Sequence, residues 1–175
     1  MDAGDALALA RFWQQTLGGT LVDHGDGSAR VDPPPGHGRN ETVWVDPVPE
    51  PHVVKTRLHL DLELPAPDPE PLLRAGAQVR SEPGKDHWWI LADPDGNEFC
   101  AFPPGEASPP REQGLVAGVI QLTLDCADPQ AQATWWASVL GGSLRQAGYG
   151  PKLRGAAGFP WQEWLFQAVP DATLR

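Results

Sequence analysis

The ten residues 93–102, DPDGNEFCAF, combine a tight turn with a strand and decide how the rest of the chain is interpreted. Residues 93–96, DPDG, are typical of a turn, with Pro at the second position and Gly where φ can be positive. In the strand that follows, Glu98, Cys100 and Phe102 share one face because side chains alternate along a strand. The stretch therefore predicts a hairpin that presents a carboxylate and a thiol on one face.

Length and composition bound the class of protein. The chain has 175 residues, of which 41% are hydrophobic and 21% are charged, as in globular domains. A net charge of −10 argues against a nucleic-acid partner, which would require basic surface for phosphates. No apolar run is long enough to cross a membrane, and the first residues lack the basic start of a signal peptide. Two cysteines form no disulfide framework, so we expect a cytoplasmic protein.

An internal repeat sets the organisation of the chain. Residues 1–19 align without gaps on residues 124–142, with matching Asp, Ala and Trp positions and the same Leu-Gly-Gly ending. A more divergent copy lies between them and begins with the strand RLHLDLEL, residues 57–64. Each copy is predicted to contain a strand, a helix and three further strands. The helices begin at Asp or Asp-Pro and end at Gly, which are good N-cap and C-cap residues.

The three copies differ in completeness. The C-terminal copy has a leading strand, residues 116–125, whereas the first copy begins at its helix. We therefore predict an α+β fold of tandem βαβββ modules in two parts. Residues 1–104 would form a domain of two modules whose first strand is missing, and residues 115–175 would form a third module, half of a second domain. Either the N-terminus is truncated or the third module pairs with another chain, and we expect a homodimer formed through that C-terminal module.

The strands have two different faces. In LHLDLEL the leucines point one way, and His59, Asp61 and Glu63 point the other. The polar face lies either in bulk water or in a cavity. A face that mixes carboxylates, a histidine, a thiol and aromatic side chains suits a ligand cavity better than bare solvent.

These features resemble the vicinal oxygen chelate superfamily. The resemblance rests on the βαβββ repeat, the helices ALARFWQQTLGG and ATWWASVLGG, and LADPDGNEFCAF at the end of a module. It is closest to the glyoxalase-like group, and the superfamily also includes bleomycin-resistance proteins and extradiol dioxygenases such as dihydroxybiphenyl dioxygenase. The resemblance implies a fold in which two modules form a cup. It does not imply one reaction, since this fold serves lyases, isomerases, oxygenases and drug-binding proteins.

The resemblance also implies where a metal would lie. Metal-using members take His or Gln from the first strand of each module and Glu from the last strand. His59 and Gln121 match the first-strand position, but Cys100 stands where the middle module would have its glutamate. A His/Cys pair favours Zn²⁺, with Fe²⁺ as a further possibility, and a third ligand would have to come from Asp46, Glu98 or Gln121. In the last module, Gln167 stands at the position that Asp46 has in the first module. We therefore expect a cup without a catalytic metal.

Three hypotheses for function follow. The first is a protein that binds a small aromatic or cationic molecule, because tryptophans can stack on a planar ligand and carboxylates can meet its charge. The predicted ligand-binding residues are His59, Asp61, Trp89, Glu98 and Cys100. The alternative is a metal-dependent lyase, isomerase or dioxygenase, in which His59 would bind the metal and Glu98 would move a proton. The third is a fold that acts only in assembly.

Overall fold

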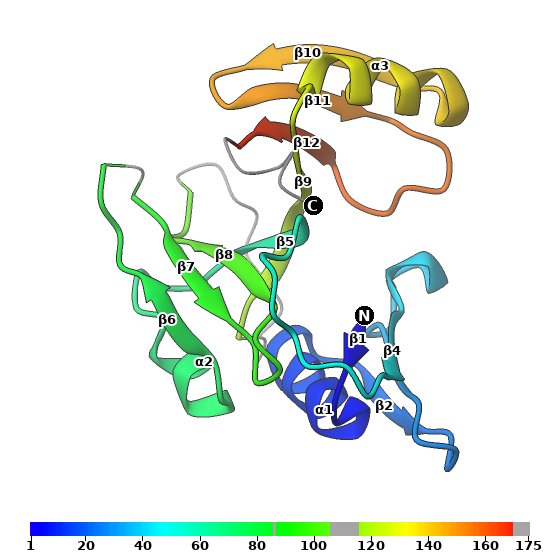
Figure 1. Cartoon of the computed structure of the whole chain (residues 1–175), viewed down its shortest axis with the longest axis vertical. Helices are drawn as coiled ribbons and strands as arrows, with labels where there is room; N and C mark the ends of the chain where they lie inside the picture. Colours follow the sequence, from blue (N-terminus) through cyan, green and yellow to red (C-terminus); the bar gives the residue numbers. More distant parts are fainter. Residues whose placement is uncertain (86, 106–115, 170–175) are drawn as a thin grey trace. The chain divides into compact units, whose positions relative to one another are not determined.

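A computed structural model describes residues 1–85, 87–105 and 116–169 (Figure 1). The chain forms two compact units. Unit 1 comprises Met1–Lys55 and Leu62–Gly118, and unit 2 comprises Thr56–Asp61 and Val119–Arg175. Each unit is described by itself. The strand β5, Leu58–Glu63, is divided between them: residues 58–61 belong to unit 2 and the last two residues belong to unit 1.

The first module of unit 1 is a four-stranded sheet with the order β1-β4-β3-β2. Its elements are β1 (Asp2–Ala3), α1 (Ala6–Leu17), β2 (Thr20–Asp23), β3 (Ala29–Asp32), the 3₁₀ turn η1 (Arg39–Glu41) and β4 (Val43–Pro47). The two residues of β1 pair in parallel with β4, with Asp2 opposite Asp46. The prediction that this module has no leading strand is therefore wrong. A two-residue piece of it precedes α1.

The second module of unit 1 is built around an antiparallel set of three strands. Its elements are the end of β5, α2 (Glu70–Ala75), β6 (Gln78–Ser81), β7 (Trp89–Ala92) and β8 (Glu98–Phe102). The two modules share an aromatic core, because Phe12 and Trp13 of α1 contact Phe99 of β8 with ring centroids 6.1 and 5.4 Å apart. Phe12, Trp13 and Phe99 are all buried. Trp13, one of the matching Trp positions of the repeat, therefore packs in the core of unit 1.

The turn at residues 93–96 forms as the sequence predicts. Oδ1 of Asp93 accepts hydrogen bonds from the backbone N–H groups of Asp95, at 3.1 Å, and Asn97, at 2.9 Å. Gly96 has a φ of 96°, in the region that a glycine tolerates. Burial raises the pKa of Asp93, although the bonds from Asn97 and Asp95 oppose this. Oδ1 of Asp95 also accepts from the N–H of Gly4 at 2.9 Å, so the turn fastens the two modules of unit 1 together.

Unit 2 contains one module, with strands in the order β10-β11-β12-β9 and residues 58–61 of β5 beside β9. Its other elements are β9 (Gly118–Cys126), α3 (Pro129–Leu140), β10 (Ser143–Ala147), β11 (Gly150–Arg154) and β12 (Glu163–Ala168). Asp128 caps α3 as predicted, accepting from the N–H of Ala131 at 2.9 Å.

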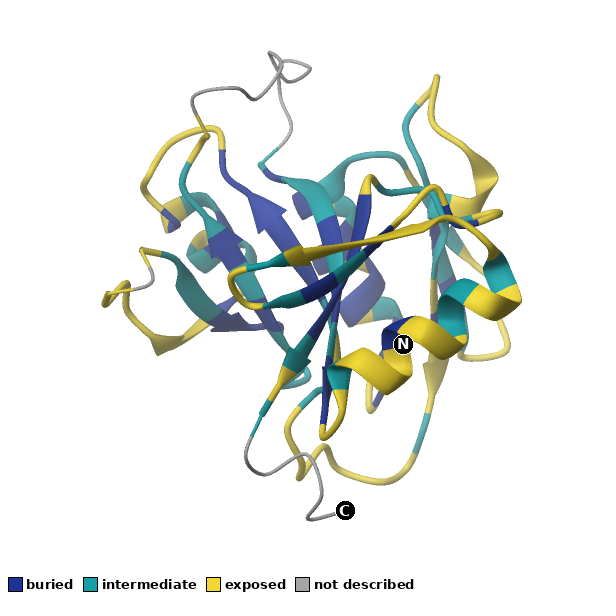
Figure 2. Cartoon of the chain, turned by 90° about the horizontal axis from the view of Figure 1, so that it is seen from above, coloured by how far each residue is buried: buried dark blue, intermediate teal, exposed yellow. Residues whose placement is uncertain are grey.

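The helix α3 covers one face of the sheet in unit 2 (Figure 1). The core between them is apolar and is formed by buried Cys126, Ala133, Leu153, Ala156, Trp164 and Phe166. The outer side of α3 is exposed, as Figure 2 shows for the helix in its foreground. Across the part of the chain that the structure describes, no helix has the length and apolar character needed to cross a membrane.

Candidate functional site

The face of the unit 2 sheet that points away from α3 is polar. β12 pairs in parallel with β9, and Glu163 stands directly opposite Gln121. Because side chains alternate, Leu122 and Trp164 point to the core under α3, whereas Gln121, Thr123 and Glu163 point to the other face. One residue from the first strand of the module and one from its last strand thus lie side by side.

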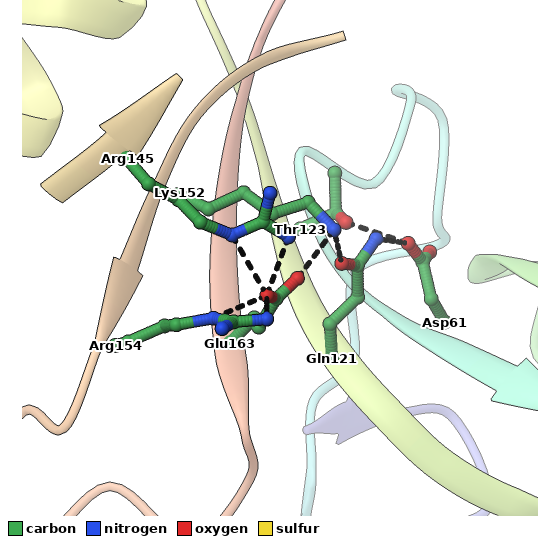
Figure 3. A network of polar contacts seen from close by, with 7 residues as sticks. All are labelled: Asp61, Gln121, Thr123, Arg145, Lys152, Arg154 and Glu163. Atoms are coloured by element: carbon green, nitrogen blue, oxygen red, sulfur yellow. Dashed lines mark hydrogen bonds and ion pairs between the residues drawn. The ribbon is translucent and has the colours of Figure 1, made fainter. Parts of the chain in front are cut away.

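Glu163 is surrounded by three cations, and together the four residues form the Glu163 cluster (Figure 3). Nη2 of Arg145 donates to Oε1 of Glu163 at 2.6 Å, and Nε of Arg154 donates to the same oxygen at 2.5 Å. Nζ of Lys152 donates to Oε2 at 2.5 Å. Arg145 and Lys152 reach the carboxylate together because they stand opposite each other in the β10–β11 hairpin.

The charge state of Glu163 follows from these contacts. The side chain is 9% exposed, and burial alone would raise the pKa of its carboxyl group. Hydrogen bonds from Lys152, Arg145 and Arg154 outweigh burial and lower the pKa from 4.5 to about 2. Glu163 is therefore a carboxylate at any physiological pH.

Lys152 links the cluster to a second buried carboxylate. Its Nζ donates to Oε1 of Gln121 at 2.7 Å as well as to Glu163. Nε2 of Gln121 then donates to Oδ2 of Asp61 at 2.6 Å, and the hydroxyl of Thr123 donates to the same oxygen at 2.8 Å. The polar network therefore runs from β11 across β12 and β9 to β5, within unit 2 (Figure 3).

His59 and Asp61, two of the predicted ligand-binding residues, both belong to unit 2. Nε2 of His59 lies 3.5 Å from Oδ1 of Asp61, and both side chains are less than one-tenth exposed. The two residues are neighbours on the polar face of β5, as the alternation predicts. Asp61 in this way connects His59 to Gln121 and Thr123.

Glu98 and Cys100 belong to unit 1 and share a face of β8, opposite Ala92 and Ile90 of β7. Glu98 also lines a shallow hollow of about 440 Å³ in unit 1. The other residues that line it are His52, Val53, Val54, Lys55, Gln78, Arg80, Pro94, Asp95 and Gly96. In the hollow, Nε2 of His52 lies 3.9 Å from Oε2 of Glu98.

Trp89 requires a correction. It stands opposite Ala101, and residues opposite each other in an antiparallel pair point to the same face. Trp89 therefore points to the face of Ala101, away from Glu98 and Cys100. Trp88 instead lies beside Phe102, which shares the face of Glu98 and Cys100, and the two ring centroids are 5.1 Å apart.

None of the four residues of the Glu163 cluster was predicted from the sequence. The repeat aligns Gln167 of the last module with Asp46, and the structure agrees with this alignment, since Gln167 stands opposite Asp125 as Asp46 stands opposite Asp2. The partner of Gln121 is instead Glu163, at the start of the same strand. Glu163 precedes Gln167 by the same number of residues as Gln121 precedes Asp125, so this spacing could have identified Glu163 from the sequence.

The pair of Gln121 and Glu163 matches the type of residue that metal-using relatives place on these strands, but its surroundings do not fit a metal ion. The oxygens Oε1 of Gln121 and Oε2 of Glu163 both accept from the ammonium of Lys152. Two guanidinium groups occupy Oε1 of Glu163. A divalent cation at this point would meet three positive charges at close range.

The comparisons with known proteins agree on the family. A sequence model described as "glyoxalase-like domain" matches residues 1–102 and 121–175. None of the curated proteins compared with the chain matches it. Among solved structures, glyoxalase I from Zea mays is similar, with a TM-score of 0.59 and 19% identity over 94% of this chain and 64% of that one. A point mutant of the same enzyme gives a TM-score of 0.63 and 18% identity, covering 95% of this chain and 66% of that one.

A candidate dioxygenase from Bacillus subtilis subsp. subtilis str. 168 is also similar. Its TM-score is 0.59 at 14% identity, over 97% of this chain and 62% of that one. The chain thus spans a little under two thirds of the length of these proteins, and at such identities the likeness concerns the fold alone. The family match and the tandem βαβββ modules lead to one conclusion: the chain belongs to the glyoxalase-like domain family of the vicinal oxygen chelate superfamily.

Proposed function

We propose that this glyoxalase-like protein binds a small organic molecule on the polar sheet face of unit 2, without a catalytic metal between Gln121 and Glu163. The single observation that supports the proposal is the position of Lys152. Its ammonium bonds to both residues, at 2.7 and 2.5 Å, and so provides the positive charge that a metal ion would otherwise bring. Polar donors and acceptors on one sheet face, with half-exposed arginines beside them, suit the recognition of a polar ligand.

A metal ion could displace Lys152 only at a high cost. The ammonium would lose two charge-assisted or polar hydrogen bonds in a largely buried place, since its side chain is 17% exposed. The incoming ion would still lie close to Arg145 and Arg154, and like charges at such distances repel strongly where water is scarce. These residues therefore support a binding site in which the ammonium of Lys152, and not a metal ion, is the cation between Gln121 and Glu163.

The proposal is tested by the metal content of protein purified without chelator, together with Mn²⁺ titration monitored by calorimetry. We expect no stoichiometric metal that depends on Gln121 or Glu163. Lys152→Met removes the ammonium and frees two oxygens, so this variant should bind Mn²⁺ more tightly than the wild type, whereas the matched control Lys85→Met should not. Stoichiometric metal in the wild type that is lost in Glu163→Gln would overturn the proposal.

A second candidate function is a metal-dependent lyase, isomerase or dioxygenase. The observation that favours it is the pair of His59 and Asp61, which brings an imidazole nitrogen within 3.5 Å of a carboxylate oxygen. Nitrogen and oxygen donors of this kind bind Zn²⁺ or Fe²⁺. Near-stoichiometric metal that is lost in His59→Ala but retained in Glu163→Gln would favour this function, because it would assign the metal to His59 and not to Glu163.

The proposed location is the cytoplasm. Cys100 and Cys126 form no disulfide bond in the described part of the chain, as is usual for cysteines in a reducing compartment.

A further inference from the structure

The Glu163 cluster carries more positive than negative charge, in a chain whose net charge is −10. Three cations converge on one carboxylate. Asp61, the other acidic residue of the network, is held by Gln121 and Thr123 and lies beside His59. Counting Asp61 with the cluster still leaves one positive charge in excess. A local excess of positive charge on an acidic protein attracts anions to that place.

Arg145 and Arg154 retain hydrogen-bonding capacity. A guanidinium group has five N–H donors, and the bonds to Glu163 employ only the Nε and Nη2 groups of each arginine. Their side chains are 43% and 51% exposed, so the remaining donors can be reached from solvent. Lys152, by contrast, is mostly buried and bonds to both Gln121 and Glu163. The two arginines are therefore the accessible part of the cluster.

Glu163 holds the two arginines in place. Both guanidinium groups donate to the same oxygen, Oε1, so the carboxylate draws them together from β10 and β11. Long side chains that are already ordered lose less conformational entropy when a ligand binds. A planar guanidinium also pairs well with the two oxygens of a carboxylate or phosphate group.

We propose that Arg145 and Arg154 form an anion-binding subsite that recognises a carboxylate or phosphate group on the small-molecule ligand. This inference rests on the proposed function, because it names the chemical class of the ligand bound on the same sheet face. It replaces the cationic ligand expected from the overall charge of the chain with an acidic one. Glu163 acts as an internal anion that fills the inner side of the cluster and leaves the outer side to the ligand.

The test is a titration with three probes at constant ionic strength and in the presence of chelator. Benzoate represents a carboxylate, inorganic phosphate represents a phosphate group, and benzamide is the neutral counterpart of benzoate. Binding affinity is measured by calorimetry, which also applies to variants that lack these arginines, and the binding place is followed by NMR through the Nε–H signals of the arginines. We expect benzoate or phosphate to shift the signals of Arg145 and Arg154 in a saturable way, and the tighter of the two identifies the group. Benzamide should leave both signals unchanged.

Three variants complete the test. The double variant Arg145→Gln/Arg154→Gln should weaken binding of the anion by about tenfold or more, as expected for the loss of charge-assisted bonds. Arg74→Gln on α2, an exposed arginine in unit 1, is the matched control and should bind the anion as the wild type does. Glu163→Gln loosens the arginines but also removes the internal anion that competes for their donors, and because the second effect is the larger, this variant should bind the probe more tightly.

Equal binding of benzoate and benzamide, or unchanged anion affinity in the double variant, would overturn the inference. Such a failure is distinguishable from failure of the proposed function, because the chelator removes metal from the titration. If the anion does not bind while the wild type still lacks a metal that depends on Glu163, the metal-free site stands and only its acidic ligand is lost.

Discussion

Phe12 in α1 and Trp135 in α3 occupy the same position in two copies of one helix, but Phe12 is 2% exposed and Trp135 is 55% exposed. The next position on this face shows the same contrast, with Thr16 at 0% and Val139 at 56%. In unit 1 this face packs against Phe99 of the second module. One position on this face is less apolar in α3, because the exposed Gln132 of α3 aligns with the buried Leu9 of α1.

We predict that two copies of the chain associate through this face of α3. Two α3 faces would bury each other much as the two modules of unit 1 do, and such an interface is self-complementary, as in most homodimers. Val139→Glu should shift the protein to the monomer, because it places a charge in the contact. Val53→Glu, at an even more exposed valine of unit 1, is the control and should leave association unchanged. Light scattering after size exclusion is the measurement, and a wild-type monomer at micromolar concentration contradicts the prediction.

The lowered pKa of Glu163 predicts how stability depends on pH. A carboxyl group whose pKa falls on folding stabilises the protein above its unfolded value, near 4.5, and this contribution disappears as the pH falls toward about 2. The contribution amounts to at most about 3 kcal/mol. Urea unfolding between these pH values should show the loss in the wild type. In Glu163→Gln this part of the pH dependence should be absent, and the variant should be less stable at neutral pH because three cations lose their carboxylate. An unchanged slope in the variant would argue against the cluster as described.

Asp93 is predicted to be the most important residue of the 93–96 turn. Asp93→Ala removes bonds to the backbone of Asp95 and Asn97 and leaves these donors without their acceptor. The free energy of unfolding should fall by about 2–3 kcal/mol. Asp95→Ala is the comparison, since it removes the one bond from Gly4 and should cost about 1 kcal/mol. Chemical denaturation that gives equal losses for both variants contradicts this ranking.

The β10–β11 hairpin offers a matched pair of glycines. Gly150 has a φ of 143°, and a Cβ added there would lie 2.1 Å from the backbone oxygen of Phe166. Gly150→Ala should therefore destabilise unit 2 by about 3 kcal/mol or more through strain and overlap. A Cβ added at Gly148 meets nothing within 4 Å, so Gly148→Ala should be nearly neutral. Thermal unfolding compares the two, and similar melting temperatures for both variants would count against the hairpin geometry.

Local features of the fold could be predicted from the sequence because they depend on neighbouring residues. Asp128 caps α3, the 93–96 turn closes a hairpin, and the repeat aligns Asp46 with Gln167 as the strand pairing does. Alternation along a strand also placed His59 and Asp61 on one face. Each of these inferences needed only spacing within one element or one repeat.

Features that depend on strand register could not be predicted in this way. Trp88 and Trp89 exchange faces when a strand shifts by one residue, and the backbone just before them is irregular, with a positive φ of 63° at His87. The Glu163 cluster is assembled from β10, β11 and β12, and its residues come together only through two strand pairings. The sequence carries no short motif for such a cluster.

The division of the chain has a practical consequence for expressing its parts. Thr56–Asp61 lies in the middle of the sequence but belongs with Val119–Arg175. No single cut can separate the two units, because a fragment that starts after residue 118 lacks the segment that carries His59 and Asp61. In such a fragment the amide of Gln121 and the hydroxyl of Thr123 would lose their shared acceptor. A fragment of unit 2 that folds on its own would have to carry Thr56–Asp61 as a grafted strand. Autonomous folding of Val119–Arg175 therefore depends on a segment from the middle of the chain.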